Sequence, residues 1–187
     1  MIYFSNKFSA SKDDAKTIFI TQSLCGLDQV FDYFKNALSF PYPYSTELRF
    51  NYYAFCEIME ELNWLPETVI NICHKNLPAL NEEELGGNYL DALNIIDVRW
   101  EKFYERAEIS KKFYEEHPEK FMHHDGAAWW DNKPKIFNVY FRKQDEQYVK
   151  TLLSKYSWDY RKCIHYDEKG DEQIDFKKRY PINDRLF

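Results

Sequence analysis

Three short apolar runs, rich in β-branched and aromatic residues, predict strands of one sheet. They cover 17–20 (Thr-Ile-Phe-Ile), 69–73 (Val-Ile-Asn-Ile-Cys) and 136–141 (Ile-Phe-Asn-Val-Tyr-Phe). Short runs of this composition, bounded by charged or turn-forming residues, are typical of buried strands. The long intervals between them leave room for helices.

The intervals between the runs carry helical periodicity. Apolar side chains recur every three or four positions in 24–38, in 46–62 and in about 88–106. Pro41 and Pro43 separate the first two of these segments, because proline ends a helical pattern. The resulting order, β-α-α-β-α-β, predicts an α/β fold with a small three-stranded parallel sheet and right-handed crossovers.

The remainder of the chain predicts a smaller unit after this fold. A helix is expected over 144–156, followed by a β-hairpin within 158–180 that turns at 167–171. We therefore expect an α/β domain over 1–143 and a C-terminal extension over 144–187 that consists of a helix and a hairpin.

Composition narrows the class of protein. Mean hydropathy is -0.68, with 44% hydrophobic and 30% charged residues, which excludes a disordered chain. No apolar run has the length of a membrane-spanning helix, and the first residues lack the pattern of a signal peptide. We expect a cytoplasmic protein with no membrane partner. The cysteines, which form no CxxC pair, are expected to be buried thiols rather than disulfides or zinc ligands; they are Cys25, Cys56, Cys73 and Cys163.

Negative charge is concentrated in the middle of the chain. The net charge is -6, but 40–100 alone holds ten acidic and three basic residues, a local charge of -7. Such a segment repels phosphates, so a nucleic-acid partner is not expected and a basic protein is favoured. Aromatic residues make up 19% of the chain, and exposed aromatic side chains are common in binding surfaces.

The second predicted helix offers a candidate binding face. Thr46 or Ser45 is its expected N-cap, and its apolar stripe points to one side of a helical wheel. Two aromatic and two acidic residues point the opposite way, Glu60 lies at the edge, and two tyrosines stand in the preceding loop. The candidate partner-binding residues are Tyr42, Tyr44, Phe50, Tyr53, Glu57, Glu60 and Glu61. The alternative is an ordinary solvated acidic face.

The same region resembles the barstar family of barnase-type ribonuclease inhibitors. Leu38-Ser39-Phe40-Pro41 is similar to the end of the family's first helix, and Tyr42 and Tyr44 are similar to its loop aromatics. Asn51-Tyr52-Tyr53-Ala54-Phe55-Cys56-Glu57 is similar to its helix motif. The resemblance covers about 16–143. Ser45 stands where the family has glycine, about four residues are inserted before Asn51, and Tyr53 replaces the first aspartate.

This resemblance implies a function. Glu57 falls where the family places an acid that enters the nuclease active site, so the chain is expected to be an inhibitor, or immunity protein, of a basic barnase-like ribonuclease. A carboxylate on a rigid helix can take the position of a phosphate in a cationic active site. The expected partner is a cognate basic ribonuclease or another basic toxin protein, with no cofactor.

Two alternatives remain open. One is a barstar-like binding module for a different basic protein. The other is a metal-dependent enzyme that uses His117, His123 and His124. Catalysis is not expected, because Glu57 and Glu61 point outward from a convex helix rather than into a cleft.

Overall fold

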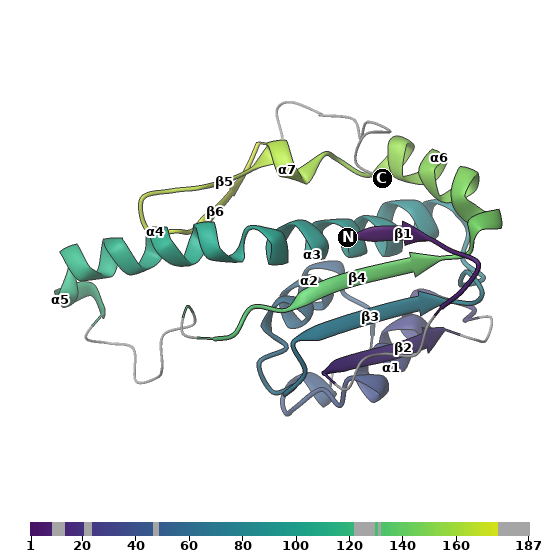
Figure 1. Cartoon of the computed structure of the whole chain (residues 1–187), viewed down its shortest axis with the longest axis horizontal. Helices are drawn as coiled ribbons and strands as arrows, with labels where there is room; N and C mark the ends of the chain where they lie inside the picture. Colours follow the sequence, from purple (N-terminus) through teal and green to yellow (C-terminus); the bar gives the residue numbers. More distant parts are fainter. Residues whose placement is uncertain (9–13, 21–23, 47–48, 122–129, 131, 176–187) are drawn as a thin grey trace.

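The chain folds around a four-stranded parallel β-sheet with helices packed against it (Figure 1). The computed structural model describes residues 1–8, 14–20, 24–46, 49–121, 130 and 132–175. Within these residues, no helix combines the length and the apolar character needed to cross a membrane.

The three predicted strands are confirmed. They are β2 (Ala15–Ile20), β3 (Val69–His74) and β4 (Ile136–Phe141), and all pair in parallel. Ile72 of β3 lies opposite Ile18 on one side and Val139 on the other. All three side chains are buried, as expected of β-branched residues at the centre of a covered sheet face.

A fourth strand corrects the three-stranded prediction. β1 (Ile2–Phe4) lies beside β4, also in parallel, so the order across the sheet is β1-β4-β3-β2. Ile2 pairs with Val139 and Phe4 with Phe141. The strand has three residues, which is too short for a recognisable pattern, and its partner lies at the far end of the α/β unit. Periodicity within a local window therefore could not reveal it.

The helices between β2 and β4 follow the predicted order, with different bounds. They are α1 (Leu27–Ala37), α2 (Tyr52–Glu61), a π-helix η2 (Glu84–Leu90), α3 (Asp91–Glu101), α4 (Phe103–Glu116) and the short α5 (Pro118–Phe121). The third predicted helix is thus a longer series that begins as a π-helix and is interrupted at Lys102. Its predicted apolar stripe, which includes Leu93 and Ile96, is buried.

The two faces of the sheet differ in polarity. Towards the helices, the strands present buried residues such as Ile70 and Phe137. The opposite face carries a row of polar side chains, in which Asn138 donates to Asn71 (3.0 Å) and Asn71 donates to Thr17 (3.3 Å). Amides that bond to one another across strands satisfy their polar groups on a half-exposed face.

The C-terminal part contains the predicted helix and hairpin. A 3₁₀ turn, η4 (Lys143–Asp145), leads into α6 (Glu146–Tyr156) and α7 (Tyr160–Cys163), and the antiparallel strands β5 (Ile164–Tyr166) and β6 (Glu172–Ile174) follow. The expected turn at 167–171 is confirmed, whereas 176–180 lies outside the described residues.

The hairpin runs along α3 and α4 (Figure 1). Lys102 donates to the carbonyl of Ile164 (2.8 Å), and the Ser110 hydroxyl donates to the carbonyl of Lys169 (2.9 Å). Gly170 closes the turn with φ of 82°, and a Cβ at this position would come within 2.0 Å of the Ser110 hydroxyl oxygen. The turn therefore requires glycine both for its backbone angle and for its approach to α4.

The N-terminus of α2 provides a first testable point. Its N-cap is Asn51 rather than Ser45 or Thr46, which belong to a separate 3₁₀ turn, η1 (Tyr44–Thr46). The Asn51 side chain accepts from the backbone N–H of Ala54 (3.0 Å). Replacing Asn51 with alanine should cost about 1 kcal/mol of unfolding free energy, because that N–H loses its acceptor. Urea denaturation measures the change; Asn51→Ser, which keeps a capping oxygen, is the control, and equal losses in both variants would contradict the capping role.

Candidate functional site

The exposed face of α2 carries three of the predicted binding residues. Phe55, Met59 and Leu62 anchor the helix in the core, which turns the opposite side towards solvent. Tyr53 is 73% exposed, and Glu57, one turn later, is also exposed. Glu61 follows after a further turn and is exposed as well. These three side chains form one stripe along the helix, as residues four positions apart do.

The loop before α2 adds two tyrosines beside this stripe. Tyr42 is 83% exposed and precedes Pro43 through a cis peptide bond. Tyr44 is half-buried, and its hydroxyl donates to the Glu61 carboxylate (2.8 Å). This hydrogen bond raises the pKa of Tyr44. Loop and helix are therefore joined side chain to side chain at the C-terminal end of the stripe.

Phe50 does not lie on the outward stripe where the helical wheel placed it. It precedes α2, and its ring is half-buried against Phe31 (6.4 Å between centroids) and Phe55 (5.9 Å). Its backbone N–H donates to Asp28 (2.5 Å). The wheel assumed that the helix began near Thr46, whereas the helix begins six positions later, so the geometry of a helix does not apply to Phe50.

The surroundings of Glu60 also differ from those expected from the helical wheel, which placed it at the edge of the outward stripe. Its side chain is 18% exposed and forms an ion pair with Arg99 of α3, with Arg106 of α4 at 3.7 Å. Burial raises the pKa of Glu60, an effect that the cationic partners oppose. Arg99 in turn makes two hydrogen bonds to Glu172 of β6, at 2.8 and 2.5 Å. Glu60 is thus part of a linkage between α2, α3 and the hairpin rather than a solvent-facing acid.

A small hollow lies between the stripe and the helix series that follows. It has a volume of about 300 Å³ and is lined by Glu57, Glu60, Glu61, Trp100, Phe103, Arg106 and Asn132. Trp100 is fixed in it by a hydrogen bond from its indole nitrogen to the carbonyl of Met59 (3.0 Å). Carboxylates and aromatic rings that line the same hollow suit the charged end and the aliphatic stem of a basic side chain.

Part of the acidic segment does not contribute to the surface. Asp91 and Asp97 are 7% and 6% exposed, and Asp97 is paired with Arg161 at 3.2 Å. Glu82 is exposed but paired with Lys155 at 2.5 Å. The local charge of -7, counted from the sequence, is therefore larger than the negative charge that this segment presents to solvent. In the stripe itself, the charge comes from Glu57 and Glu61.

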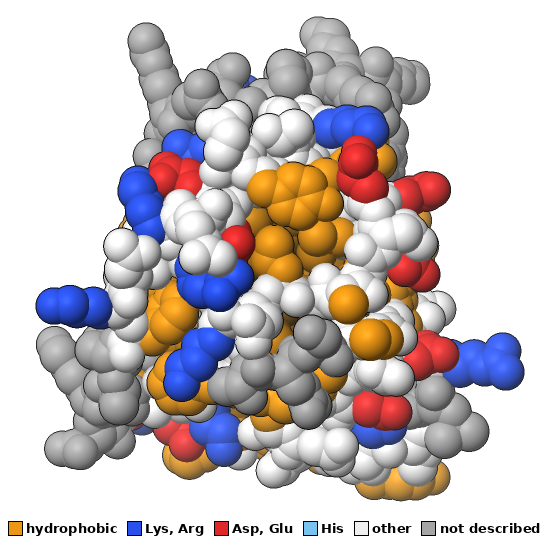
Figure 2. Space-filling model, turned by 90° about the vertical axis from the view of Figure 1, so that its right-hand side faces the viewer, with side chains coloured by type: hydrophobic (Ala, Val, Ile, Leu, Met, Phe, Trp, Pro, Cys, Tyr) orange, Lys and Arg blue, Asp and Glu red, His pale blue; other side chains and the backbone are white. Residues whose placement is uncertain are grey.

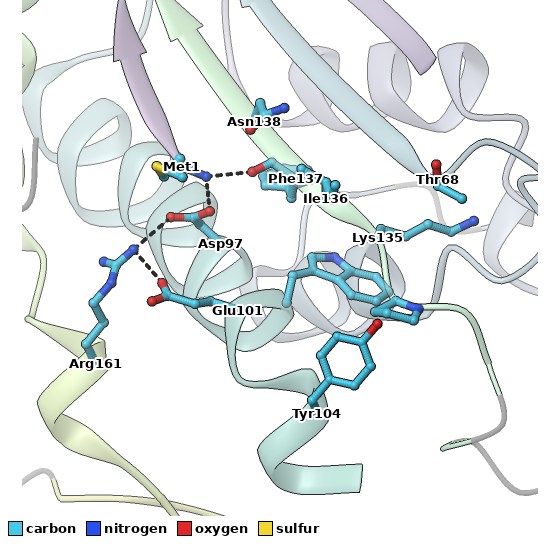
Figure 3. Close-up of a pocket in the computed structure, with 12 residues that line it drawn as sticks. Met1, Thr68, Asp97, Glu101, Tyr104, Lys135, Ile136, Phe137, Asn138 and Arg161 are labelled. Atoms are coloured by element: carbon cyan, nitrogen blue, oxygen red, sulfur yellow. Dashed lines mark hydrogen bonds and ion pairs between the residues drawn. The ribbon is translucent and has the colours of Figure 1, made fainter. Parts of the chain in front are cut away.

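A cavity of about 670 Å³ lies near the N-terminal end of β4, and Figure 3 shows the residues around it. Asp97 is directed towards the amino group of Met1 and towards Arg161, and Arg161 also reaches Glu101 (2.7 Å). The ammonium of Lys135 is held by the carbonyls of Leu65 (2.6 Å) and Glu67 (2.8 Å). Asp97, Glu101, Arg161 and the amino group of Met1 are paired with one another, and the Lys135 ammonium is held by backbone carbonyls, so the charged groups of this cavity all have partners within the protein.

The carboxyl ends of the strands, where many parallel α/β proteins bind ligands, point towards the face in Figure 2. Hydrophobic side chains gather near its centre, with charged ones around them. His74 ends β3 but is fully buried: Nε2 lies 2.6 Å from the Tyr89 hydroxyl and Nδ1 lies 3.1 Å from the carbonyl of Tyr140. A sealed, fully bonded imidazole is a structural group rather than an accessible base.

The histidines and cysteines give no metal centre in the described part of the chain. His117 lies 3.7 Å from Glu119 and packs on Phe113, whereas His123 and His124 lie outside the described residues. No group of three or more His, Cys, Asp or Glu side chains that could hold a metal ion occurs among the described residues. The prediction of buried thiols is confirmed for Cys56, Cys73 and Cys163 but is wrong for Cys25, which is exposed. Burial raises the pKa of Cys56 to about 12.

Comparison of the chain with protein-family models, curated proteins and solved structures found no match. The geometry of the molecule therefore carries the functional argument.

Sequence reasoning missed Arg99 and Asp91, which organise the surroundings of α2. A signal was present: Asp91, Asn94 and Asp97 recur every third position in a segment that is otherwise apolar. Polar residues on the buried side of a helix indicate a satisfied internal network rather than a surface charge.

Proposed function

We propose that this protein is a barstar-like inhibitor that binds a basic barnase-type ribonuclease through the exposed stripe of α2 and the loop before it. The observation that carries the proposal is the exposure of Tyr53, Glu57 and Glu61 on consecutive turns of one helix, with Tyr42 and Tyr44 beside them. Exposed aromatic rings around carboxylates are typical of a protein-binding surface rather than of a solvated face.

The chemistry of the stripe suits a cationic active site. A ribonuclease holds RNA through positively charged groups, and a carboxylate fixed on a helix can engage the same groups. Glu57 lies in the middle of α2, whose core side is anchored by Phe55 and Met59. Glu61 is oriented by the Tyr44 hydroxyl, so less conformational freedom is lost when it meets a partner.

The central test removes Glu57. We expect Glu57→Ala to weaken binding to the nuclease by about 2 kcal/mol or more, because a charged group at the centre of an interface dominates its energy. The unfolding free energy should change by less than about 0.5 kcal/mol, because Glu57 is exposed. Calorimetry with a purified barnase-type ribonuclease gives the affinity, and inhibition of RNA hydrolysis gives the activity.

Glu83→Ala is the matched control. Glu83 is also exposed but lies away from the stripe, at the start of the π-helix, so its loss should alter the association rate and its salt dependence more than the affinity. If Glu57→Ala bound the nuclease as tightly as the wild type, the interface would lie elsewhere on the molecule and the proposal would be overturned.

A second candidate uses the same stripe. Carboxylates and tyrosines also recognise basic proteins that are not nucleases, so a barstar-like binding module for such a partner is compatible with this face. Loss of binding in Glu57→Ala with a basic partner that has no ribonuclease activity would favour this function over the inhibitor.

A further inference from the structure

A further cavity, which borders the exposed stripe at Tyr53, lies between α2, the π-helix and the segment that joins α6 to α7. Its volume is about 420 Å³, in the range of small-molecule sites. Its walls are unusually aromatic, with rings from Tyr52, Tyr53, Tyr156, Trp158 and Tyr160. Trp158 and Tyr160 stack with their ring centroids 6.1 Å apart.

A buried carboxylate belongs to the same wall. Asp91 is 7% exposed, and its Oδ2 accepts hydrogen bonds from the hydroxyls of Tyr52 (2.6 Å) and Tyr160 (2.8 Å). Its Oδ1 is buried and has no hydrogen-bond partner among the described residues. Burial raises the pKa of Asp91, whereas the hydroxyls of Tyr52, Tyr160 and Ser157 lower it by favouring the charged form. A charge that is only partly compensated in this way favours a nearby cation.

The other ionisable groups of the wall do not supply that cation. Arg99 lines the cavity, but its guanidinium is engaged by Glu60 and by Glu172. Cys56 is a neutral thiol, since burial raises its pKa to about 12. An anionic ligand would meet the Asp91 carboxylate and find Arg99 already occupied.

We propose that this cavity binds a small organic ammonium ion, held by cation–π contacts with the tyrosine and tryptophan rings and by the negative charge of Asp91. Ring faces carry negative potential and attract ammonium groups within about 6 Å. The rings of Tyr52 and Tyr160 should attract a cation more strongly than a free phenol does, because a phenol that donates a hydrogen bond to a carboxylate gains electron density in its ring. Binding at this site needs no nuclease, although the two proposed sites share Tyr53.

Choline chloride is a suitable probe, and 3,3-dimethylbutan-1-ol is its control, because the two have the same shape and differ in charge. Isothermal calorimetry on the full chain should show binding of choline at one site per chain and at least tenfold weaker binding of the alcohol. Equal binding of both compounds, or no binding of choline, would overturn the proposal.

Two variants locate the site. Asp91→Asn should weaken choline binding about tenfold or more, because the charge facing the cation is removed. Tyr53→Leu should weaken it about threefold to tenfold through loss of one ring, and because Tyr53 is 73% exposed this variant tests the site even if Asp91→Asn does not fold. Tyr104→Leu is the matched control: Tyr104 is 69% exposed but lines the cavity of Figure 3. Equal effects of Tyr53→Leu and Tyr104→Leu, or unchanged choline affinity in Tyr53→Leu, would show that choline does not bind in this cavity and would overturn the proposal.

Discussion

Replacing Arg99 with methionine is expected to lower the free energy of unfolding by about 3–5 kcal/mol. Arg99 is 15% exposed and pairs with two carboxylates, those of Glu60 and Glu172, whose own side chains are 18% and 17% exposed. Without the guanidinium, both acids would remain half-buried; Glu60 would keep Arg106 at 3.7 Å, and Glu172 would lose its two hydrogen bonds to Arg99. The loss of stability comes from this uncompensated charge, more than from the value of the pair itself.

Guanidinium chloride denaturation measures this loss, and Lys143→Met is its control. Lys143 pairs with Glu146 at 2.5 Å but is 58% exposed, so its replacement should cost less than about 1 kcal/mol. Adding Glu60→Gln to Arg99→Met should recover part of the stability, because one stranded charge is removed. Similar losses of stability in Arg99→Met and Lys143→Met would contradict this prediction, because they would show that water solvates Glu60 and Glu172 once Arg99 is removed.

Acid is expected to destabilise the fold through His74. Burial lowers the pKa of this imidazole from 6.5 to about 4. The folded chain thus binds the proton more weakly than the unfolded chain does. The stability due to neutral His74 is fully present above about pH 6.5 and is lost progressively as the pH falls towards 4. A shift of this size corresponds to about 3 kcal/mol.

A comparison of two pH profiles isolates this contribution. Unfolding free energies of wild type and His74→Gln are measured from pH 7 to pH 4, and the difference between them should shrink by about 3 kcal/mol on acidification. The difference is needed because Glu60 acts in the opposite sense: its raised pKa means that the folded state binds this proton more tightly, so its contribution falls as the pH rises. Parallel profiles would show that His74 is not sealed from solvent protons.

The strands and hairpin could be predicted because their signal is local. Ile18, Ile72 and Val139 lie in short apolar runs, and Ile164-His165-Tyr166, before the turn at 167–171, alternates apolar and polar residues. β1 (Ile2–Phe4) could not, because three residues give no periodicity and its strand partner, β4, starts at residue 136.

The candidate face could be predicted only in part. A helical wheel gives the direction of a side chain but not its neighbours. It was adequate for Tyr53 and Glu57, which meet solvent. It failed for Glu60, because the decisive neighbour, Arg99, belongs to another helix. The charge count along the sequence was also a poor guide to the surface charge, because Asp91 and Asp97 are buried among neighbours from other parts of the chain.

The pairing of β1 with β4 has a consequence for how the chain folds during its synthesis. Ile2 leaves the ribosome 137 positions ahead of Val139, its partner in the register. At about 5–20 residues per second, translation of that interval takes roughly 7–27 s. β2 and β3 can pair during this time. β1 can pair only after β4 has been synthesised, and this pairing closes a very long loop. β1 is therefore the last strand to join the sheet, and with three residues to hold it, the first to leave when the fold opens locally.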